Sequence, residues 1–229
     1  MTEELARRIV LGRGWLALQP ADFQQAVLSR SVFRVWKDGD TIYDLGAQPD
    51  GIYGLASGSL SLFIAPHRPG PFFAHVARPG YWVGEAAHFT NTPRRAGLIA
   101  RGRVTMFHLP PRGLADLCST VPDAAWRIGA ITVSHLDLAL SVVSTLMIRE
   151  PIRRVASYLL ILTGWNCAPA EPWDSIDMTQ ADLADLCQLS RKSIVVAIAR
   201  LQEAGAVRHG HRLITILDRG QLSRLTAAE

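Results

Sequence analysis

The residues best suited to binding chemistry lie in one short stretch, GYWVGEAAHFTNTPRRAGLIA, at residues 80–100. Gly84 and Glu85 come first, a short polar loop follows, and Arg94 and Arg95 stand directly after a proline. A guanidinium presents its N–H groups as a planar fork that matches the oxygens of a phosphate. The pattern therefore predicts a loop that binds a phosphorylated ligand, or that keeps the shape of a loop which once did.

A second stretch, MTQADLADLCQLSRKSIVVAIARLQEAGAV at residues 178–207, predicts two helices joined by a tight turn. Thr179 and Asp182 have the spacing of a capping box, and Ser190 can cap the second helix. Gly205 is expected to end that helix in the left-handed conformation. The apolar side chains expected to face inward are Leu183, Leu186, Ile194, Ile198 and Leu201. This order is typical of a DNA-binding helix-turn-helix.

The start of the second helix leaves side chains available for the major groove of DNA. Arg191 is the predicted base reader, because its fork can pair with guanine O6 and N7. Lys192 reads a base or contacts a phosphate, and Val195 or Val196 touches a thymine methyl group. The predicted phosphate contacts, which set register without reading sequence, are Thr179, Ser190, Ser193 and Arg200.

Positive charge is concentrated around this motif. Residues 189–212 hold five arginines and lysines and a single acid, Glu203. The following segment, VRHGHRLITIL, predicts a β-hairpin with His209 and Gly210 at its turn, which would form a wing. The predicted partner is double-stranded DNA.

A long helical segment at residues 123–149 must connect these regions, because it holds no proline and only one glycine. One apolar stripe, spaced three and four residues apart, consists of Val133, Leu136, Leu140, Val143 and Met147. A second stripe, interrupted by His135, consists of Ile128, Ile131, Leu138 and Val142. If one stripe covers the helix's own domain, the other needs a partner, and a second copy of the same helix is the simplest one. A helix buried on all sides within one subunit is the alternative.

Residues 32–109 read as short strands separated by Gly, Pro and Asp turns, which predicts an antiparallel sandwich or barrel. A helix is expected before them at residues 21–29, and another begins at Pro151. The predicted fold class is α+β, with an N-terminal β-barrel domain at 1–122, a dimerisation helix at 123–149 and a winged helix-turn-helix domain at 150–229.

Composition limits the class of protein. The chain has 229 residues, of which 48% are hydrophobic, so it can bury a core. Its net charge of +4 permits an anionic partner. It shows no uninterrupted apolar run of about 18 residues, and its first residues lack the apolar core of a secretory signal, so we expect a cytoplasmic protein without a membrane partner. The three cysteines have no metal-ligand spacing, and we expect no metal.

In the order barrel, long helix and winged helix-turn-helix, the chain resembles the Crp/Fnr family of bacterial transcription regulators, which includes the cyclic-AMP receptor protein. RPGYWVGEAAHFTNTPRRAGLIA is similar to the family's phosphate-binding cassette, and TQADLADLCQLSRKSIVVAIARLQEAGAV is similar to its DNA-binding helices. The resemblance implies a homodimer that binds an inverted repeat of DNA and that can contact RNA polymerase. Gln188 stands where the family's turn usually has glycine.

The resemblance also assigns roles within the opening loop. Glu85 would bind a ribose hydroxyl and Arg94 a cyclic phosphate, with Gly84 letting the backbone come close. Arg95 stands where the family has a small hydroxyl residue, and the polar pair that contacts the purine corresponds to the apolar Ala139 and Leu140. We therefore expect weak or no binding of cyclic AMP. Alternatives are that Glu85 and Arg94 pair with each other, or that another small effector binds.

Other chemistries have little support. The N-terminus lacks the cysteine cluster of the family's iron–sulfur sensors, and His75 and His88 alone do not make a haem site, so we expect neither cofactor. The motifs GxSxG, GxGxxG and HExxH are all missing from the sequence, and we expect no enzyme. The competing reading is a cyclic-nucleotide-type sensor that acts through protein contacts rather than DNA.

Overall fold

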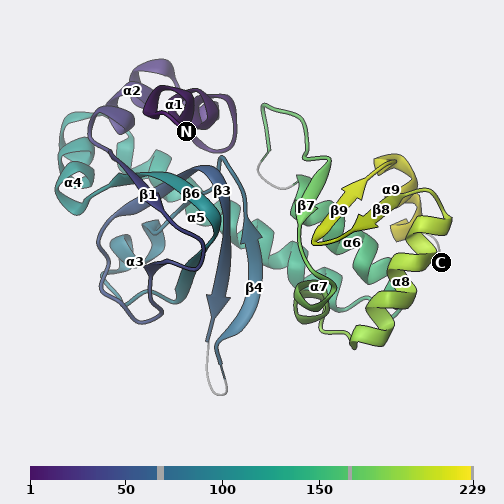
Figure 1. The fold of residues 1–229 in the computed structure, drawn as a ribbon. Coiled ribbons are helices and arrows are strands. Elements are labelled where there is room, and N and C mark those ends of the chain that lie inside the picture. Colours follow the sequence, from purple (N-terminus) through teal and green to yellow (C-terminus); the bar gives the residue numbers. More distant parts are fainter. Residues whose placement is uncertain (66–69, 165–166, 228–229) are drawn as a thin grey trace. The chain divides into compact units, whose positions relative to one another are not determined.

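The computed structural model describes residues 1–65, 70–164 and 167–227. The chain forms two compact units (Figure 1). The first contains residues 1–135 and 166–170, and the second contains residues 136–165 and 171–229. The boundary between the units falls inside one continuous helix, α5 (Ala124–Leu146).

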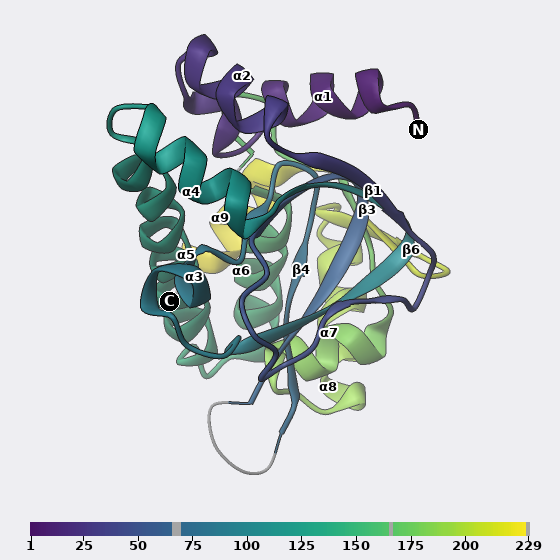
Figure 2. The same ribbon diagram turned by 90° about the vertical axis from the view of Figure 1, so that its left-hand side faces the viewer.

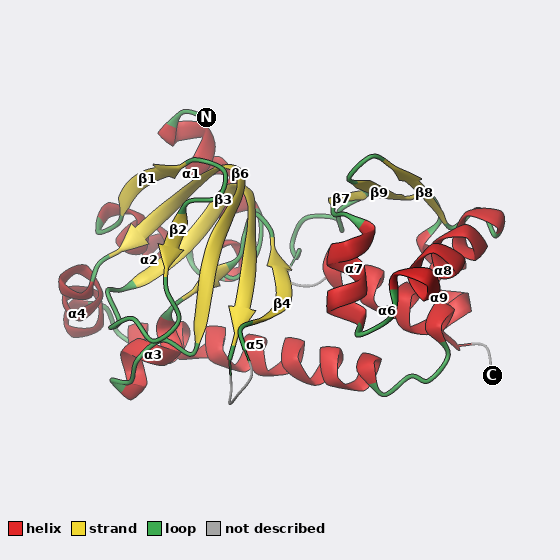
Figure 3. Ribbon diagram, turned by 60° about the horizontal axis from the view of Figure 1, so that its bottom comes forward, coloured by secondary structure: helices red, strands yellow, loops and turns green. Residues whose placement is uncertain are grey.

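The first unit is built on an antiparallel sheet (Figure 3). Its strands are β1 (Val32–Trp36), β2 (Thr41–Tyr43), β3 (Ile52–Ile64), β4 (Phe72–Ala77), β5 (Trp82–Val83) and β6 (Ala96–Leu109). They pair in the order β1-β6-β3-β4, with β2 also on β6 and β5 also on β3. Among the described residues no pairing joins β4 to β1, so the jelly-roll sheet curls like a barrel without closing.

The strands are longer than their turn residues predict. Strands β3 and β6 have 13 and 14 residues, so they are not the short strands that were expected within residues 32–109. Gly58, with φ of +77°, lies within β3 where the pairing with β6 shifts register. A glycine in the left-handed region bends a strand without ending it, which explains why a turn residue is found inside a continuous strand.

Helices cover one end of this sheet (Figure 2). They are α1 (Glu3–Gly12), the 3₁₀ helix Leu16–Leu18, α2 (Ala21–Ser29) and α4 (Pro111–Thr120). Of these, the sequence predicted α2 with the observed bounds and missed the other three. The core that they enclose with α5 includes the buried side chains of Trp15, Phe23, Trp82, Phe107 and Ile128.

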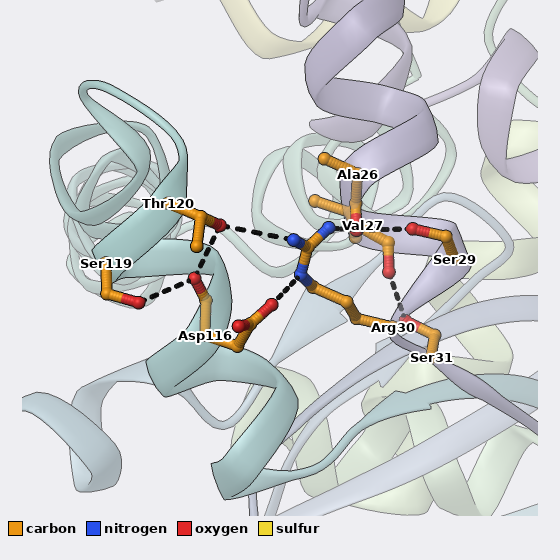
Figure 4. Close-up of polar contacts among 8 residues, drawn as sticks. All are labelled: Ala26, Val27, Ser29, Arg30, Ser31, Asp116, Ser119 and Thr120. Atoms are coloured by element: carbon orange, nitrogen blue, oxygen red, sulfur yellow. Dashed lines mark hydrogen bonds and ion pairs between the residues drawn. The ribbon is translucent and has the colours of Figure 1, made fainter.

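A single arginine fastens α2 to α4 (Figure 4). Arg30 donates from Nε to Asp116 at 2.6 Å, from Nη2 to the Thr120 hydroxyl at 3.1 Å and from Nη1 to the Ala26 carbonyl at 3.1 Å. Arg30 follows α2 directly, so its side chain acts as a C-terminal cap as well as a brace between helices.

The second unit packs α6 (Pro151–Gly164), α7 (Gln180–Cys187), α8 (Arg191–Glu203) and α9 (Arg219–Ala227) with a small sheet of β7 (Ser175–Asp177), β8 (Val207–Gly210) and β9 (Leu213–Ile216). The strand order is β7-β9-β8 (Figure 3). Buried side chains from the helices meet in its core, among them Leu159, Leu183, Ile198 and Leu222. The predicted start of α6 at Pro151 is confirmed, whereas α9 was not predicted.

Candidate functional site

The loop singled out by the sequence is partly helical. Gly84 has φ of +111° and leads from β5 into the short helix α3 (Glu85–Thr90), which replaces part of the polar loop expected there. A Cβ on Gly84 would lie 2.7 Å from the Gly51 carbonyl oxygen and 2.9 Å from Nη1 of Arg94. Gly84 is thus needed twice, for its backbone conformation and for the close approach of these groups.

Glu85 is buried, at 1% exposure, and its carboxylate faces α5. Oε1 accepts a hydrogen bond from the Thr132 hydroxyl at 3.1 Å and lies 3.0 Å from Nδ1 of His135. The His135 ring stacks on Tyr81 with a centroid distance of 5.0 Å. The other oxygen, Oε2, is buried without a hydrogen-bond partner. An unpaired acceptor of this kind is costly and is available to a ligand that brings a donor.

Arg94 is buried as well, with only 2% of its side chain exposed. Nη2 donates to a carboxylate oxygen of Asp50 and, at 3.0 Å, to the Gly51 carbonyl. The guanidinium carbon lies 3.7 Å from the centre of the Tyr43 ring, within the range of a cation–π contact. The proposed alternative in which Glu85 and Arg94 pair with each other is therefore wrong, because Arg94 pairs with Asp50 whereas the Glu85 carboxylate contacts Thr132 and His135.

Asp50, which the sequence did not single out, is held from two sides. The Tyr53 hydroxyl donates to its carboxylate at 2.5 Å, and Nε2 of His108 lies 2.8 Å from its carbonyl oxygen. Burial alone would raise the pKa of Asp50, but the hydrogen bonds from Tyr53 and Arg94 outweigh burial and lower it. The carboxylate opposite Arg94 is therefore ionised at neutral pH.

The remaining residues predicted for this site are exposed. Arg95 is exposed immediately before β6. Ala139 and Leu140 are exposed on α5, in the part of the helix that belongs to the second unit. The structure thus brings Gly84, Glu85 and Arg94 together with three residues that sequence reasoning missed: Asp50, Thr132 and His135. Only the three-residue spacing of Thr132 and His135, two polar side chains on one face of a helix, could have drawn attention to the last two.

Helix α5 carries its two apolar stripes on opposite sides. Ile128, Ile131 and Leu138 are buried, as expected of a stripe that faces its own protein. The other stripe is exposed, with between 55% and 76% exposure for each of its residues, Val133, Leu136, Leu140, Val143 and Met147. Trp126, seven residues before Val133, is 74% exposed. The alternative of a helix buried on all sides within the subunit is therefore wrong.

By length and composition alone, α5 is also apolar enough to cross a membrane. Only 22% of its most apolar window is buried. Arg127, Thr132, His135 and Asp137 interrupt that apolar character, and Thr132 and His135 are engaged with Glu85. A helix with one apolar side for its own domain and a second for a partner passes the same test of composition.

The two helices of the second predicted motif form as expected. Thr179 and Asp182 make a reciprocal capping box, with bonds of 3.0 Å and 2.9 Å, and the Ser190 hydroxyl accepts from the Ser193 N–H at 3.1 Å. Gly205 has φ of +70°, as predicted. Gln188 has φ of +51°, so this side chain occupies a position that glycine would adopt with less strain.

Arg154 on α6 supports the turn between these helices. Its Nη1 donates to the carbonyl oxygens of Cys187 and Gln188 at 3.1 and 3.4 Å, and its Nε donates to Ile148 at 2.8 Å. Cationic groups that bind the last carbonyls of a helix stabilise its C-terminus. The turn is thereby fixed although it lacks the usual glycine.

The start of α8 presents an exposed surface of mixed chemistry. Arg191, Lys192, Val195 and Val196 are all exposed, and both valines are 51% accessible. Arg200 is exposed and pairs with Glu203 at 3.1 Å. Because both partners are largely in water, this pair is weak and leaves the guanidinium available. Ser190 and Ser193 share a hydroxyl contact of 2.9 Å beside this surface.

The hairpin that follows differs from the prediction in its turn. Strands β8 and β9 pair through Gly210 and Leu213, so the turn consists of His211 and Arg212, and the expectation of a turn at His209 and Gly210 is wrong. Arg212 takes φ of +54° there. The tip of the hairpin therefore carries a histidine and an arginine rather than a glycine, and Arg208 is exposed on β8.

Comparison with known proteins identifies both units. Residues 33–121 match the cyclic nucleotide-binding domain family, and residues 153–225 match the Crp-like helix-turn-helix domain family. No curated protein matches the chain.

Solved structures share the fold over most of the chain. FixK2 from Bradyrhizobium japonicum is 19% identical, with a TM-score of 0.72 over 87% of this chain and 98% of its own. The c-di-GMP-responsive global regulator CLP from Xanthomonas campestris is 20% identical, with a TM-score of 0.66 over 87% and 100%. A CRP/FNR-family transcriptional regulator from Thermus thermophilus is 22% identical, with a TM-score of 0.65 over 86% and 99%.

Proposed function

The chain belongs to the Crp/Fnr family of transcription regulators, and on that premise we propose that it binds an inverted-repeat operator as a homodimer under the control of a small effector. The family's members are DNA-binding regulators rather than enzymes. The observation that carries the proposal is the exposed start of α8, where two cations and two valines stand on a capped helix beside a hairpin with a basic tip.

The proposed roles on DNA follow from the chemistry of each side chain. Arg191 reads a guanine through its fork, Lys192 contacts a base or a phosphate, and Val195 or Val196 meets a thymine methyl. The hydroxyl groups and the outer arginine contact phosphates: Thr179, Ser190, Ser193 and Arg200. One valine stands where relatives often have a second arginine, so the preferred half-site should differ from theirs.

The proposed dimer forms through the open stripe of α5. This stripe has five apolar side chains in coiled-coil spacing, and each is more than half exposed in the single chain. Exposure of such a surface to water is unfavourable, and the same stripe on a second copy could bury it. A two-fold axis between the helices would present two copies of α8 in opposite directions. The operator is then an inverted repeat, with half-site centres about 34 Å apart.

A genomic footprint of the bound protein tests the proposal most directly, because it gives the half-site and the regulated genes together. We expect a palindromic footprint whose affinity falls steeply with salt. A protein that binds all duplexes equally, or none, would instead favour the second candidate, a sensor that acts through protein contacts. RNA polymerase is the further partner proposed for the DNA-bound dimer.

The effector site is proposed at Gly84, Glu85 and Arg94. Three further positions differ from the residues of cyclic-AMP-binding relatives and should weaken cyclic-AMP binding: Arg95, Ala139 and Leu140. Arg95 offers a charge where relatives have a hydroxyl, and the two apolar side chains offer the base no hydrogen bond. We expect calorimetry to show weak or no binding of cyclic AMP. A dissociation constant below about 10 μM, or roughly −7 kcal/mol, would contradict this.

A further inference from the structure

The second unit holds both the surface proposed for dimerisation and the surface proposed for DNA. It begins within α5 at Leu136, so it contains four of the five residues of the open stripe together with α7 and α8. The geometry that relates these two surfaces is therefore a property of one compact unit. In a two-fold dimer, that geometry decides how far apart the two copies of α8 lie.

The connection between the two surfaces is short and is held at both ends. Only residues 147–150 separate α5 from α6. The Ile148 N–H donates to the Thr145 carbonyl at 3.1 Å, which continues the last turn of α5. The Glu150 carboxylate accepts from the Ile152 N–H at 3.0 Å, which caps the start of α6. The main chain between these helices is therefore tied to both of them.

Arg154 joins this connection to the turn between α7 and α8. Its Nε donates to the Ile148 carbonyl at 2.8 Å, while Nη1 donates to the carbonyls of Cys187 and Gln188 at 3.1 and 3.4 Å. Cys187 is the last residue of α7, and Ile148 lies two residues beyond α5, so one guanidinium lies between the C-terminal ends of two helices. Both ends carry a partial negative charge that a cation stabilises.

A guanidinium suits this connection because its N–H groups point in fixed and different directions. A lysine ammonium in the same place keeps the charge, but it is a point donor on a flexible stem and would hold two separate segments less rigidly. The neighbouring Arg153 makes a comparable contact elsewhere, since its Nε and Nη2 donate to the Thr226 carbonyl on α9 at 3.3 and 3.1 Å. The chain thus offers a matched control on the same helix.

We infer that Arg154 is a positioning residue for DNA binding, which fixes the start of α8 relative to the end of α5 and thereby sets the half-site spacing that the dimer accepts. The inference rests on the proposed function, because it takes α5 as the dimer interface and α8 as the recognition helix. Arg154 acts through main-chain carbonyls and needs no contact with DNA for this role. Its loss should leave the base contacts of each α8 intact and relax the distance between the two helices.

The test uses palindromic duplexes built on the operator that the footprint identifies, with the native spacer and with spacers one base pair shorter and longer. One base pair moves a half-site by about 3.4 Å and turns it by roughly 36°. The parent should prefer the native spacer by at least about tenfold, because another spacing requires the DNA to be deformed. Arg154→Gln should reduce this preference to about threefold or less, and Arg154→Lys should give an intermediate value.

Arg153→Gln and Arg153→Lys are the matched controls and should keep the preference of the parent. A loss of stability alone would weaken binding to all three duplexes by the same factor, so the ratio of affinities separates positioning from a merely structural role. If Arg154→Gln does not fold, Arg154→Lys carries the test. A parental ratio in Arg154→Lys, or equal relaxation in the Arg153 and Arg154 variants, would overturn the inference.

Failure of the inference is distinguishable from failure of the proposed function. A parent that binds no duplex specifically would contradict the proposed function, and the inference would fall with it. A parent that binds its operator but tolerates all three spacers equally would contradict the inference alone.

Discussion

At the scale of single residues, the sequence marks the ends of the loop at residues 84–94, the proposed effector site, but not the groups that complete it. Gly84, Glu85 and Arg94 are close in the chain, and their types indicate anion chemistry. Asp50 and His135 reach the same place from 35 or more residues away, through the pairing of strands and the packing of α5. No local periodicity encodes such long-range contacts, so the real partners of both charges were missed.

Arg191 and Arg200 should differ in what they contribute to DNA binding. Arg191→Ala should cost about 1–3 kcal/mol on the specific site and much less on random DNA, because a base contact carries sequence information. Arg200→Ala should weaken binding to both and reduce the salt slope by about one unit. Titrations on operator and scrambled duplexes at several salt concentrations measure this. Equal losses on both duplexes for Arg191→Ala would remove its assignment as base reader.

His75 should make the folded protein sensitive to mild acid. Burial, together with the charge of His135, lowers the pKa of His75 from 6.5 to about 3. Below pH 6.5 the unfolded chain takes up a proton that the folded one does not, so stability is present above that pH and falls as pH decreases toward 3.

Urea unfolding at pH 7 and pH 5.5 checks this effect. His75→Gln should show a smaller loss of stability over that interval than the parent. His211→Gln, at an exposed position in the hairpin turn, is the control and should follow the parent. A parent whose stability is unchanged between the two pH values would contradict the expectation.

At the scale of elements, local signals predicted the helices of the second unit well and the turns less well. Thr179 and Ser190 cap their helices through contacts within three residues, which the sequence shows directly. The sequence placed the hairpin turn two residues too early, because Gly210 is a typical turn residue. In the structure Gly210 pairs with Leu213 as part of β8, and the turn consists of His211 and Arg212. Helices α1, α4 and α9 were missed, and α3 was taken for a loop.

The turn between α7 and α8 offers a direct test of backbone strain. Gln188→Gly should raise the free energy of unfolding by about 0.5–1 kcal/mol, because a side chain in the left-handed region is strained. The control Gln202→Gly makes the same change inside α8 and should lower stability by about the same amount. Chemical denaturation of the parent, Gln188→Gly and Gln202→Gly measures the three free energies of unfolding. A destabilised Gln188→Gly would show that its contact with the Asp185 carbonyl outweighs the strain.

At the scale of the whole molecule, the order of the two domains could be predicted from sequence because each carries its own pattern. Short strands with turn residues identified the first, and capped amphipathic helices identified the second. The open stripe of α5 was also predictable, since its five residues follow one helical spacing and all remain exposed. Its partner is not encoded in any single chain and stays a proposal.

Leu140→Glu should convert the proposed dimer into monomers, since it would bury like charges across the two-fold axis. Sedimentation at micromolar concentration measures the assembly, and the monomeric variant should also lose affinity for the operator. Ser141→Glu places the same charge one residue on, outside the stripe, and should leave the dimer intact. If the parent protein sediments only as a monomer at this concentration, the proposed interface is wrong.

Dimerisation through the open stripe of α5 would have a consequence for gene dosage. When only the paired form occupies an operator and most chains are still single, the amount of paired protein rises with the square of the amount synthesised. Doubling expression then yields about four times as many competent regulators, by mass action. The five side chains of this stripe would set the strength of dimerisation, and thereby the number of copies per cell at which the controlled genes begin to respond.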